Sequence, residues 1–336
     1  MKVAVIGAGS FGTTMASLAA HNADTTIWAH REEVANAIDH HHENPAFHPG
    51  VRLPDNLRAT HDLGACLNGA DAAVMAVPTQ YIRSVMESAA PHMPPGIPII
   101  SLAKGIEIGS LLRPTEVIRQ SLPDWPEECV GALSGPNLAR EIMAGLPAAT
   151  SLAFTDPSVG ERLQGLFATD VFRIYTNSDV IGCEIGGAYK NVIAVMAGMS
   201  NGMGYGTNAV SSLITRGLVE MTRLGGAMGA DPLTFLGLAG VGDLVATCTS
   251  TQSRNHTVGV ELAKGRPIDV IVAEMNMVAE GVKSVEGILA LCERHGVRGP
   301  IAAMVKSVLD GEITADQVAT ALVSRPPTRE FRGIGD

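Results

Sequence analysis

The chain has 336 residues, of which 46% are hydrophobic and 17% are charged, and its formal net charge is −10. This length predicts two domains, and the composition excludes a disordered chain because it supplies enough apolar side chains for folded cores. The negative charge, the lack of a long basic run and the 4% content of aromatic residues argue against nucleic acid as the main ligand.

The cysteines and the apolar segments indicate in which cellular compartment the protein is expected. The five cysteines are scattered without a C-x-x-C pair, which is typical of ordinary thiols in a reducing compartment. Glycines interrupt the apolar N-terminus early, so it predicts a strand and not a signal peptide. No uninterrupted apolar run reaches the roughly 18 residues that a membrane span needs. We therefore expect a soluble cytoplasmic protein that does not insert into membranes.

The first half of the chain alternates between strand and helix patterns. Short apolar runs predict strands at 2–9, 25–31, 71–78, 97–105, 129–136, 148–155 and 171–177. Helical spacing occupies 10–21, 31–40, 79–93 and 156–168. This alternation predicts an α/β domain of the doubly wound Rossmann type, with a mainly parallel sheet covered on both faces.

The second half of the chain is almost entirely helical in pattern. Helical segments are expected at 189–203, 208–229, 231–237, 256–265, 269–275, 285–296, 301–311 and 314–325. We expect an all-α domain here, with 1–180 as the nucleotide-binding domain and 181–336 as the helical substrate-binding and catalytic domain. The polar, proline-containing tail 325–336 is expected to be loose.

A glycine-rich motif follows the first predicted strand and opens a helix. Gly7, Gly9 and Gly12 form G-x-G-x-x-G, with Ser10 and Phe11 inside the loop. The first glycine permits a tight turn, the second lets a pyrophosphate approach the backbone, and the third lets helix and strand pack closely. The amides at the helix N-terminus favour phosphate, so we expect a dinucleotide site.

The end of the second predicted strand indicates which dinucleotide binds. An Asp or Glu usually holds the ribose of NAD there, whereas this sequence has His30 and Arg31. Because the Arg31 guanidinium can grip a 2′-phosphate, we expect NADP(H) to be preferred, with NAD(H) possible. The alternative is that Arg31 is only a solvated residue at a helix start, and the acidic Glu32 and Glu33 that follow favour this alternative.

Three basic or polar clusters suggest a chemical site. Lys104 follows a predicted strand, where the carboxyl ends of parallel strands face a ligand crevice. Lys190 stands at the expected start of an apolar helix. Asp243 follows two glycines. Ser253, Arg254 and Asn255 precede a helical run, and polar side chains around an arginine at a helix N-terminus suit a phosphate. Taken singly, each lysine could be a solvated residue and Arg254 a surface ion-pair partner.

Seven motifs occur in this order along the chain: VIGAGSFGTTMA, SLAKGIE, LSGPNLARE, GGAYKNVIA, GLAGVGDLVATCTS, SRNHTVG and VAEGVKS. With these motifs the chain resembles the bacterial NAD(P)-dependent glycerol-3-phosphate dehydrogenases over essentially its whole length. The resemblance implies a helical C-terminal domain similar to that of 6-phosphogluconate dehydrogenase. It also implies reversible reduction of dihydroxyacetone phosphate to sn-glycerol 3-phosphate for membrane lipid synthesis.

The resemblance also implies roles for single residues. Lys190 matches the general acid/base, and Lys104 matches a lysine near both nicotinamide and substrate. The residues implied to contact substrate are Lys104, Gly135, Asn137, Lys190, Asp243, Ser253, Arg254 and Asn255. The residues implied to contact cofactor are Gly7, Gly9, Ser10, Phe11, Gly12, His30, Arg31, Lys104, Ala139, Arg254, Val278 and Glu280. Position 137 is more often Ser or Thr in the family, so Asn137 changes the hydrogen-bond geometry there.

The chemistry fits these residue types. Hydride transfer to a ketone leaves an alkoxide that needs a proton, and a lysine whose pKa is lowered by desolvation and a cationic neighbour can donate it. Lys104 would supply that neighbour, whereas Asp243 would orient Lys190 and raise its pKa, so the direction of the net shift stays open. The cofactor carries the hydride, so no metal is required.

Two other sequence features are interpreted without a catalytic role. The adjacent histidines in segment 39–44 lack the i, i+4 spacing of ligand pairs, so we expect a solvated helix end or loop and not a metal site. Cys248 lacks a triad arrangement nearby, which argues against nucleophilic catalysis.

Two other functions and an assembly state remain as hypotheses. The chain could be a related β-hydroxyacid or sugar-acid dehydrogenase, or a nucleotide-binding sensor without turnover. The apolar helices also leave surface for self-association, so a homodimer is expected.

Overall fold

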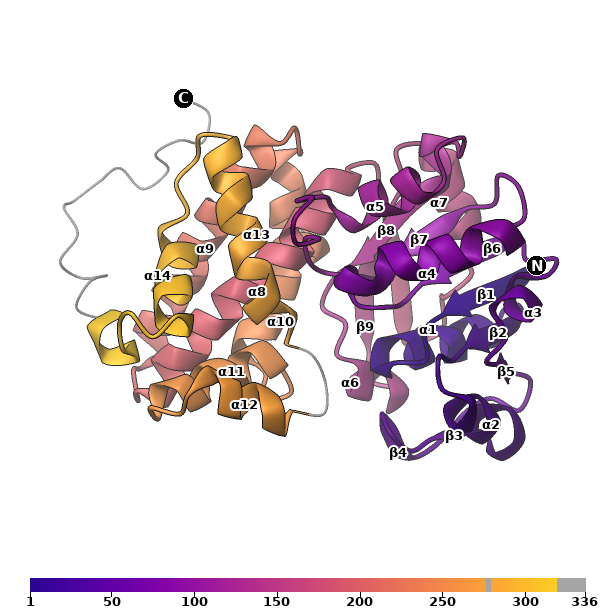
Figure 1. Ribbon diagram of the computed structural model, residues 1–336, viewed down its shortest axis with the longest axis horizontal. Coiled ribbons are helices and arrows are strands. Elements are labelled where there is room, and N and C mark those ends of the chain that lie inside the picture. Colours follow the sequence, from indigo (N-terminus) through magenta and orange to yellow (C-terminus); the bar gives the residue numbers. More distant parts are fainter. Residues whose placement is uncertain (276–278, 319–336) are drawn as a thin grey trace. The chain divides into compact units, whose positions relative to one another are not determined.

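The structure, a computed structural model, describes residues 1–275 and 279–318, and the chain divides into two units (Figure 1). The first unit comprises Met1–Ala103 and Arg113–Val180. The second unit comprises Lys104–Leu112 and the chain from Ile181 onward. The short segment Lys104–Leu112 thus belongs to the second unit, which a single division at residue 180 does not provide for.

The first unit is built on an eight-stranded sheet whose strand order is β10-β9-β8-β7-β6-β1-β2-β5. Neighbouring strands run parallel except for β8 and β9, which pair antiparallel. The central strands are buried along almost their whole length, as expected when both faces of a parallel sheet are covered. The predicted doubly wound sheet is therefore confirmed, with one antiparallel pair that was not predicted. The strands are β1 (Lys2–Ile6), β2 (Asp24–Trp28), β5 (Arg58–Thr60), β6 (Ala72–Met75), β7 (Ile99–Ser101), β8 (Val130–Ser134), β9 (Ala148–Ala153) and β10 (Phe172–Asn177).

Helices connect these strands, and α4 and α5 lie in front of the sheet in Figure 1. The first of them, α1, is buried from Gly12 to its end, because its own side chains are small or apolar on all faces of the helix. A typical start is seen at α7, where Asp156 caps the Ser158 amide and Pro157 takes the first helical position. The helices are α1 (Ser10–Ala20), α2 (Glu32–His41), α3 (Leu63–Leu67), α4 (Ile82–Ala89), α5 (Pro114–Ser121), α6 (Ala139–Met143) and α7 (Pro157–Gln164).

A short antiparallel hairpin, β3 (Glu43–Asn44) and β4 (His48–Arg52), follows α2 and was not predicted. The expectation of a solvated helix end at 39–44 is correct for His40 and His41, which are exposed in the last turn of α2. It is wrong for Asn44, which belongs to β3 and is fully buried. Within the described ranges, no group of three potential metal ligands comes together.

The second unit is helical, as predicted. Of the expected helix at 314–325, residues 315–318 are helical, and the rest, like the tail 325–336, lies outside the described residues. Its helices are α8 (Val180–Gly202), α9 (Thr207–Ala227), α10 (Asp243–Thr249), α11 (Arg254–Ala263), α12 (Ile268–Glu274), α13 (Glu280–Arg294) and α14 (Pro300–Leu309). A 3-10 helix (Pro232–Leu236) and a π-helical turn (Leu238–Gly242) precede α10.

Helix α8 forms the centre of the second unit. By length and composition alone it could cross a membrane, but 94% of its apolar window is buried inside the unit, as in the core helix of a globular protein. Its glycines allow close backbone contacts, since a Cβ on Gly198 would lie 2.0 Å from the carbonyl oxygen of His256. A Cβ on Gly186 would lie 2.4 Å from the carbonyl oxygen of Ala239. These contacts bring α11 and the π-helical turn against α8.

Candidate active site

Lys190 lies in the middle of α8 and not at its start, because the helix begins ten residues earlier, at Val180. The expectation of a helix start was therefore wrong. Glycines at 182, 186 and 187 weaken the helical pattern, but the close packing at Gly186 accommodates them. As a result the lysine is carried into the interior of the second unit, with 7% of its surface exposed.

Two lysines share one buried carboxylate in the second unit. Asp243 is 2% exposed, and its Oδ1 lies 2.7 Å from Nζ of Lys190. Its Oδ2 lies 2.7 Å from Nζ of the half-buried Lys104. Asp243 directly follows the π-helical turn as the first residue of α10, and Lys104 is the first residue of the segment Lys104–Leu112. The structure thus brings together three of the residues implied by the sequence.

Burial and charge fix the protonation behaviour of Lys190. Desolvation by burial lowers its pKa to about 8, and the positive charge of Lys104 acts in the same direction. The negative charge of Asp243 opposes this shift but does not cancel it. The direction left open by the sequence is therefore downward. A lysine with this pKa is mostly protonated at pH 7 and can still release its proton, as a general acid/base must.

Thr247 completes the surroundings of Lys190 and was missed from the sequence. Its Oγ1 accepts a hydrogen bond of 2.7 Å from Nζ of Lys190 and donates one of 2.6 Å to the Asp243 carbonyl. It stands four residues after Asp243 on α10, so the two side chains share one helix face. This i, i+4 spacing from Asp243 is the sequence pattern from which Thr247 could have been predicted.

An asparagine pair holds the backbone of Lys104. Asn191, also missed, donates from Nδ2 to the Lys104 carbonyl at 3.0 Å. Asn255 donates to Oδ1 of Asn191 at 2.9 Å and accepts from the Gly281 amide at 2.9 Å. The resemblance implies that Asn255 contacts substrate, but both ends of its side-chain amide already bond within the protein and support the segment that carries Lys104.

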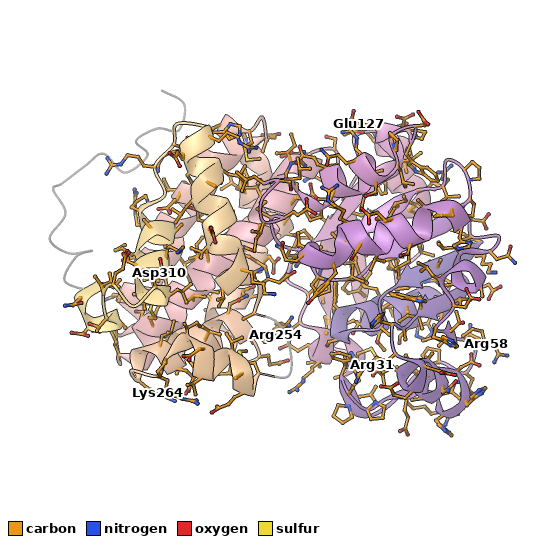
Figure 2. The ribbon with its side chains drawn as sticks, in the orientation of Figure 1. Arg31, Arg58, Glu127, Arg254, Lys264 and Asp310 are labelled. Carbon is orange, nitrogen blue, oxygen red and sulfur yellow. The ribbon has the colours of Figure 1, made fainter. Side chains whose placement is uncertain are left out.

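The other described residues of the second unit that the resemblance implies for the site lie at helix starts. Ser253 caps α11, its Oγ accepting from the His256 amide at 3.3 Å, and the exposed Arg254 is the first residue of that helix (Figure 2). An arginine beside helix amides suits a phosphate. Glu280 is the half-buried first residue of α13. Val278 lies outside the described residues.

The glycine-rich loop of the first unit fits a pyrophosphate. Gly7 has a positive φ of 121°, and a Cβ on it would lie 2.9 Å from the backbone of Ala76. A Cβ on Gly12 would lie 2.0 Å from the Gly7 carbonyl oxygen. At Gly9, by contrast, a Cβ would have no atom within 4 Å, and no side chain caps α1 there. The loop therefore leaves an open approach to helix amides, which is what a dinucleotide needs.

Four more of the residues implied to contact cofactor lie in this loop or directly after β2, the strand that pairs with β1. Ser10 and Phe11 are half-buried in the first turn of α1. His30 is exposed, with its ring edge-on to Trp28 at 5.9 Å between centroids. Arg31 is exposed at the start of α2 (Figure 2), 3.6 Å from the carboxylate of Glu33.

The loop after β8 carries Gly135 and Asn137 and leads to Ala139. A Cβ on Gly135 would lie 2.8 Å from Oγ1 of Thr150, so glycine is required there. Asn137 donates from Nδ2 to the same oxygen at 2.9 Å. Its Oδ1 is buried and has no hydrogen-bond partner among the described residues. Ala139, half-buried, begins α6.

Nucleophilic catalysis by Cys248 is disfavoured. Burial raises the pKa of this thiol to about 12, so it stays protonated and is a poor nucleophile near neutral pH.

A Rossmann-type sheet with an open glycine-rich turn, and a helical unit in which two lysines share one buried carboxylate, define a dinucleotide-dependent oxidoreductase. The family model for the NAD-dependent glycerol-3-phosphate dehydrogenase N-terminus matches residues 2–160, and that for the C-terminus matches residues 179–320. The chain belongs to the NAD-dependent glycerol-3-phosphate dehydrogenase family.

Individual relatives agree with this assignment. The chain is 52% identical to glycerol-3-phosphate dehydrogenase (NAD(P)+) 2 of Sphingopyxis alaskensis, over 96% of each chain. It is 48% identical to glycerol-3-phosphate dehydrogenase (NAD(P)+) of Streptomyces griseus, over 99% of each chain. Among solved structures, glycerol-3-phosphate dehydrogenase from Coxiella burnetii matches with a TM-score of 0.91 and 32% identity, covering 96% of this chain and 99% of that one.

Proposed function

We propose that this oxidoreductase uses NAD(P)H to reduce dihydroxyacetone phosphate reversibly to sn-glycerol 3-phosphate, with Lys190 as general acid/base. The observation that carries the proposal is the buried carboxylate of Asp243, which holds Lys190 on one oxygen and Lys104 on the other. In this proposal residues 1–180 bind the dinucleotide and 181–336 bind the phosphorylated substrate, with Lys104 also contributing.

The proposed mechanism follows from the hydrogen bonds of Lys190. A lysine ammonium has three N–H donors, and two of them go to Asp243 and Thr247. The third is available for the substrate oxygen at C2. The bound dinucleotide supplies the hydride. Lys190 then protonates the developing alkoxide, while the charge of Lys104 polarises the carbonyl.

The substrate phosphate is assigned to the start of α11. There Ser253 and Asn255 flank the exposed Arg254, and helix amides add to its positive charge. A phosphate gains charge-assisted hydrogen bonds from this arrangement. Asn137, Gly135 and Ala139 are proposed to shape the substrate and cofactor loop of the first unit.

An absorbance assay tests the proposed function. NADPH oxidation is followed at fixed enzyme concentration with dihydroxyacetone phosphate, and then with 3-keto acids. We expect turnover with the phosphorylated ketone and little with the keto acids. Turnover with keto acids alone would instead identify a β-hydroxyacid dehydrogenase. Binding of NADPH without turnover of either substrate would identify a sensor.

Cofactor preference is proposed to depend on Arg31. Replacing Arg31 with Ala should raise the KM for NADPH about tenfold, because one charge-assisted contact to the 2′-phosphate is lost. The KM for NADH should change by less than about twofold, since NADH has no such phosphate.

Arg58→Ala is the matched control, because Arg58 is also an exposed arginine of the first unit, on β5 (Figure 2). It should leave both KM values unchanged. An equal rise in both KM values in the Arg31 variant would refute the NADPH preference.

We also propose a cytoplasmic homodimer that supplies glycerol 3-phosphate to glycerophospholipid synthesis. None of the five cysteines, all of which lie in the described part of the chain, forms a disulfide, which supports a reducing compartment. The dimer rests on the apolar helices of the second half alone.

A further inference from the structure

The β3–β4 hairpin, residues Glu43–Arg52, places two buried polar side chains against the glycine-rich loop. Asn44 is fully buried and His48 is 2% exposed. A buried polar group is costly unless it is hydrogen-bonded, so the partners of these two side chains show what they do.

Each of the two side chains bonds to a backbone carbonyl of the loop, and each also lies within hydrogen-bond distance of a hydroxyl oxygen. Asn44 donates from Nδ2 to the Ala8 carbonyl at 3.0 Å and to Oγ1 of Thr13 at 2.8 Å. His48 Nε2 lies 2.8 Å from the Ser10 carbonyl oxygen. Since a carbonyl oxygen only accepts, Nε2 must carry the hydrogen and donate it.

Fixing a carbonyl also fixes the amide on the other side of the same peptide plane. A trans peptide is planar, with its C=O and N–H pointing in opposite directions. The hydrogen bond from Asn44 to Ala8 therefore orients the N–H of Gly9, at the position where the loop is open. The bond from His48 to Ser10 orients the N–H of Phe11 in the same way.

The hairpin backbone is itself restricted. Asn44 and His48 are each followed by a proline, Pro45 and Pro49. A residue before proline is confined to extended conformations, so both side chains start from a backbone with few alternatives. The two donors are thereby held in place before any ligand arrives.

We propose that Asn44 and His48 are positioning residues that set dinucleotide affinity by aiming the amides of the glycine-rich loop at the pyrophosphate. The inference rests on the proposed function, because it assumes that the loop binds NAD(P)H. It predicts an effect on cofactor binding and not on the chemical step, which belongs to the lysine site of the other unit.

The test compares two substitutions at one position. His48→Leu keeps a similar volume but cannot donate, whereas His48→Gln can donate from its amide. Fluorescence titration with NADPH should give a Kd raised about tenfold for His48→Leu, as one lost hydrogen bond to the loop allows. His48→Gln should stay within about threefold of the unaltered protein, and kcat at saturating NADPH should change less than about twofold in both.

Further variants complete the experiment. Asn44→Ala should raise the Kd at least as much, and Arg52→Ala, at the exposed end of the hairpin where Arg52 pairs with Asp55 at 2.7 Å, should not raise it. If Asn44→Ala does not fold by circular dichroism, the Leu and Gln variants of His48 decide alone. An unchanged Kd in His48→Leu, or equal losses in His48→Leu and His48→Gln, overturns the inference. Failure of the unaltered protein to bind NADPH would refute the proposed function itself.

Discussion

Replacing Lys190 with Met should lower kcat for ketone reduction about a thousandfold, because general acid catalysis of this kind contributes roughly 10²–10⁴ in rate. The apolar methionine has nearly the length of lysine and suits the 7% exposure of the site, so folding should be retained. The Kd for NADPH should change little, since the glycine-rich loop belongs to the other unit. Stopped-flow turnover and fluorescence titration measure the two effects separately.

The matched control is Lys264→Met. Lys264 lies just after α11 in the same unit, with 57% of its side chain exposed and an ion pair to Glu261 (Figure 2). Its replacement should leave kcat unchanged. Near-native turnover in Lys190→Met would show that another group moves the proton.

The pH profile of the unaltered enzyme gives an independent check on Lys190. Reduction needs the protonated amine, so its rate should be level at lower pH and fall as pH rises through about 8, the lowered pKa of Lys190. Oxidation needs the neutral amine, so its rate should rise through the same value. Both inflections should be absent in Lys190→Met.

Replacing Asp243 with Asn should damage both catalysis and stability. The variant keeps the shape but leaves Lys104 and Lys190 without their shared counter-charge, and removing one partner of a buried pair costs about 3–5 kcal/mol. Loss of the carboxylate also removes the attraction that raises the pKa of Lys190, so this pKa should fall below 8. The protonated fraction of Lys190 at neutral pH then falls, and the amine also loses the carboxylate that orients it, so kcat for reduction should drop by up to about a hundredfold.

Thermal unfolding and the pH profile together test this prediction. Asp310→Asn is the control, because Asp310 pairs with Lys306 on an exposed turn and surface pairs contribute about 0–1 kcal/mol (Figure 2). A pH inflection that stays near 8 in Asp243→Asn would falsify the electrostatic account of the Lys190 pKa.

Much of the fold was predictable because it rests on local patterns. The apolar run at 3–6, the glycines Gly7, Gly9 and Gly12 and the helical spacing that follows predict a strand, a turn and a helix. The antiparallel β8–β9 pair was not predictable, since a buried strand has the same apolar run in either direction. The hairpin at 43–52 was not predicted because its strands are polar, β4 contains a proline and another proline directly follows β3.

For the candidate site, the sequence supplied residue types but not distances. Lys104, Lys190 and Asp243 were named from their motifs, and only the fold brings Lys104 to a carboxylate 139 residues further along the chain. Asn191 was missed because its partner is a backbone carbonyl, which every residue has and no motif marks.

The assignment of Lys104–Leu112 to the helical unit has a mechanical consequence. The chain passes between the units at 103/104, 112/113 and 180/181, so the nucleotide unit is tethered to the helical one by three covalent links. Both lysines and the carboxylate lie on the same side of all three links. Any hinge motion of the nucleotide unit would therefore leave the two Nζ–Oδ distances as they are. In the proposed mechanism, the lysine that donates the proton would therefore keep its hydrogen-bond partners whatever the position of the nucleotide unit.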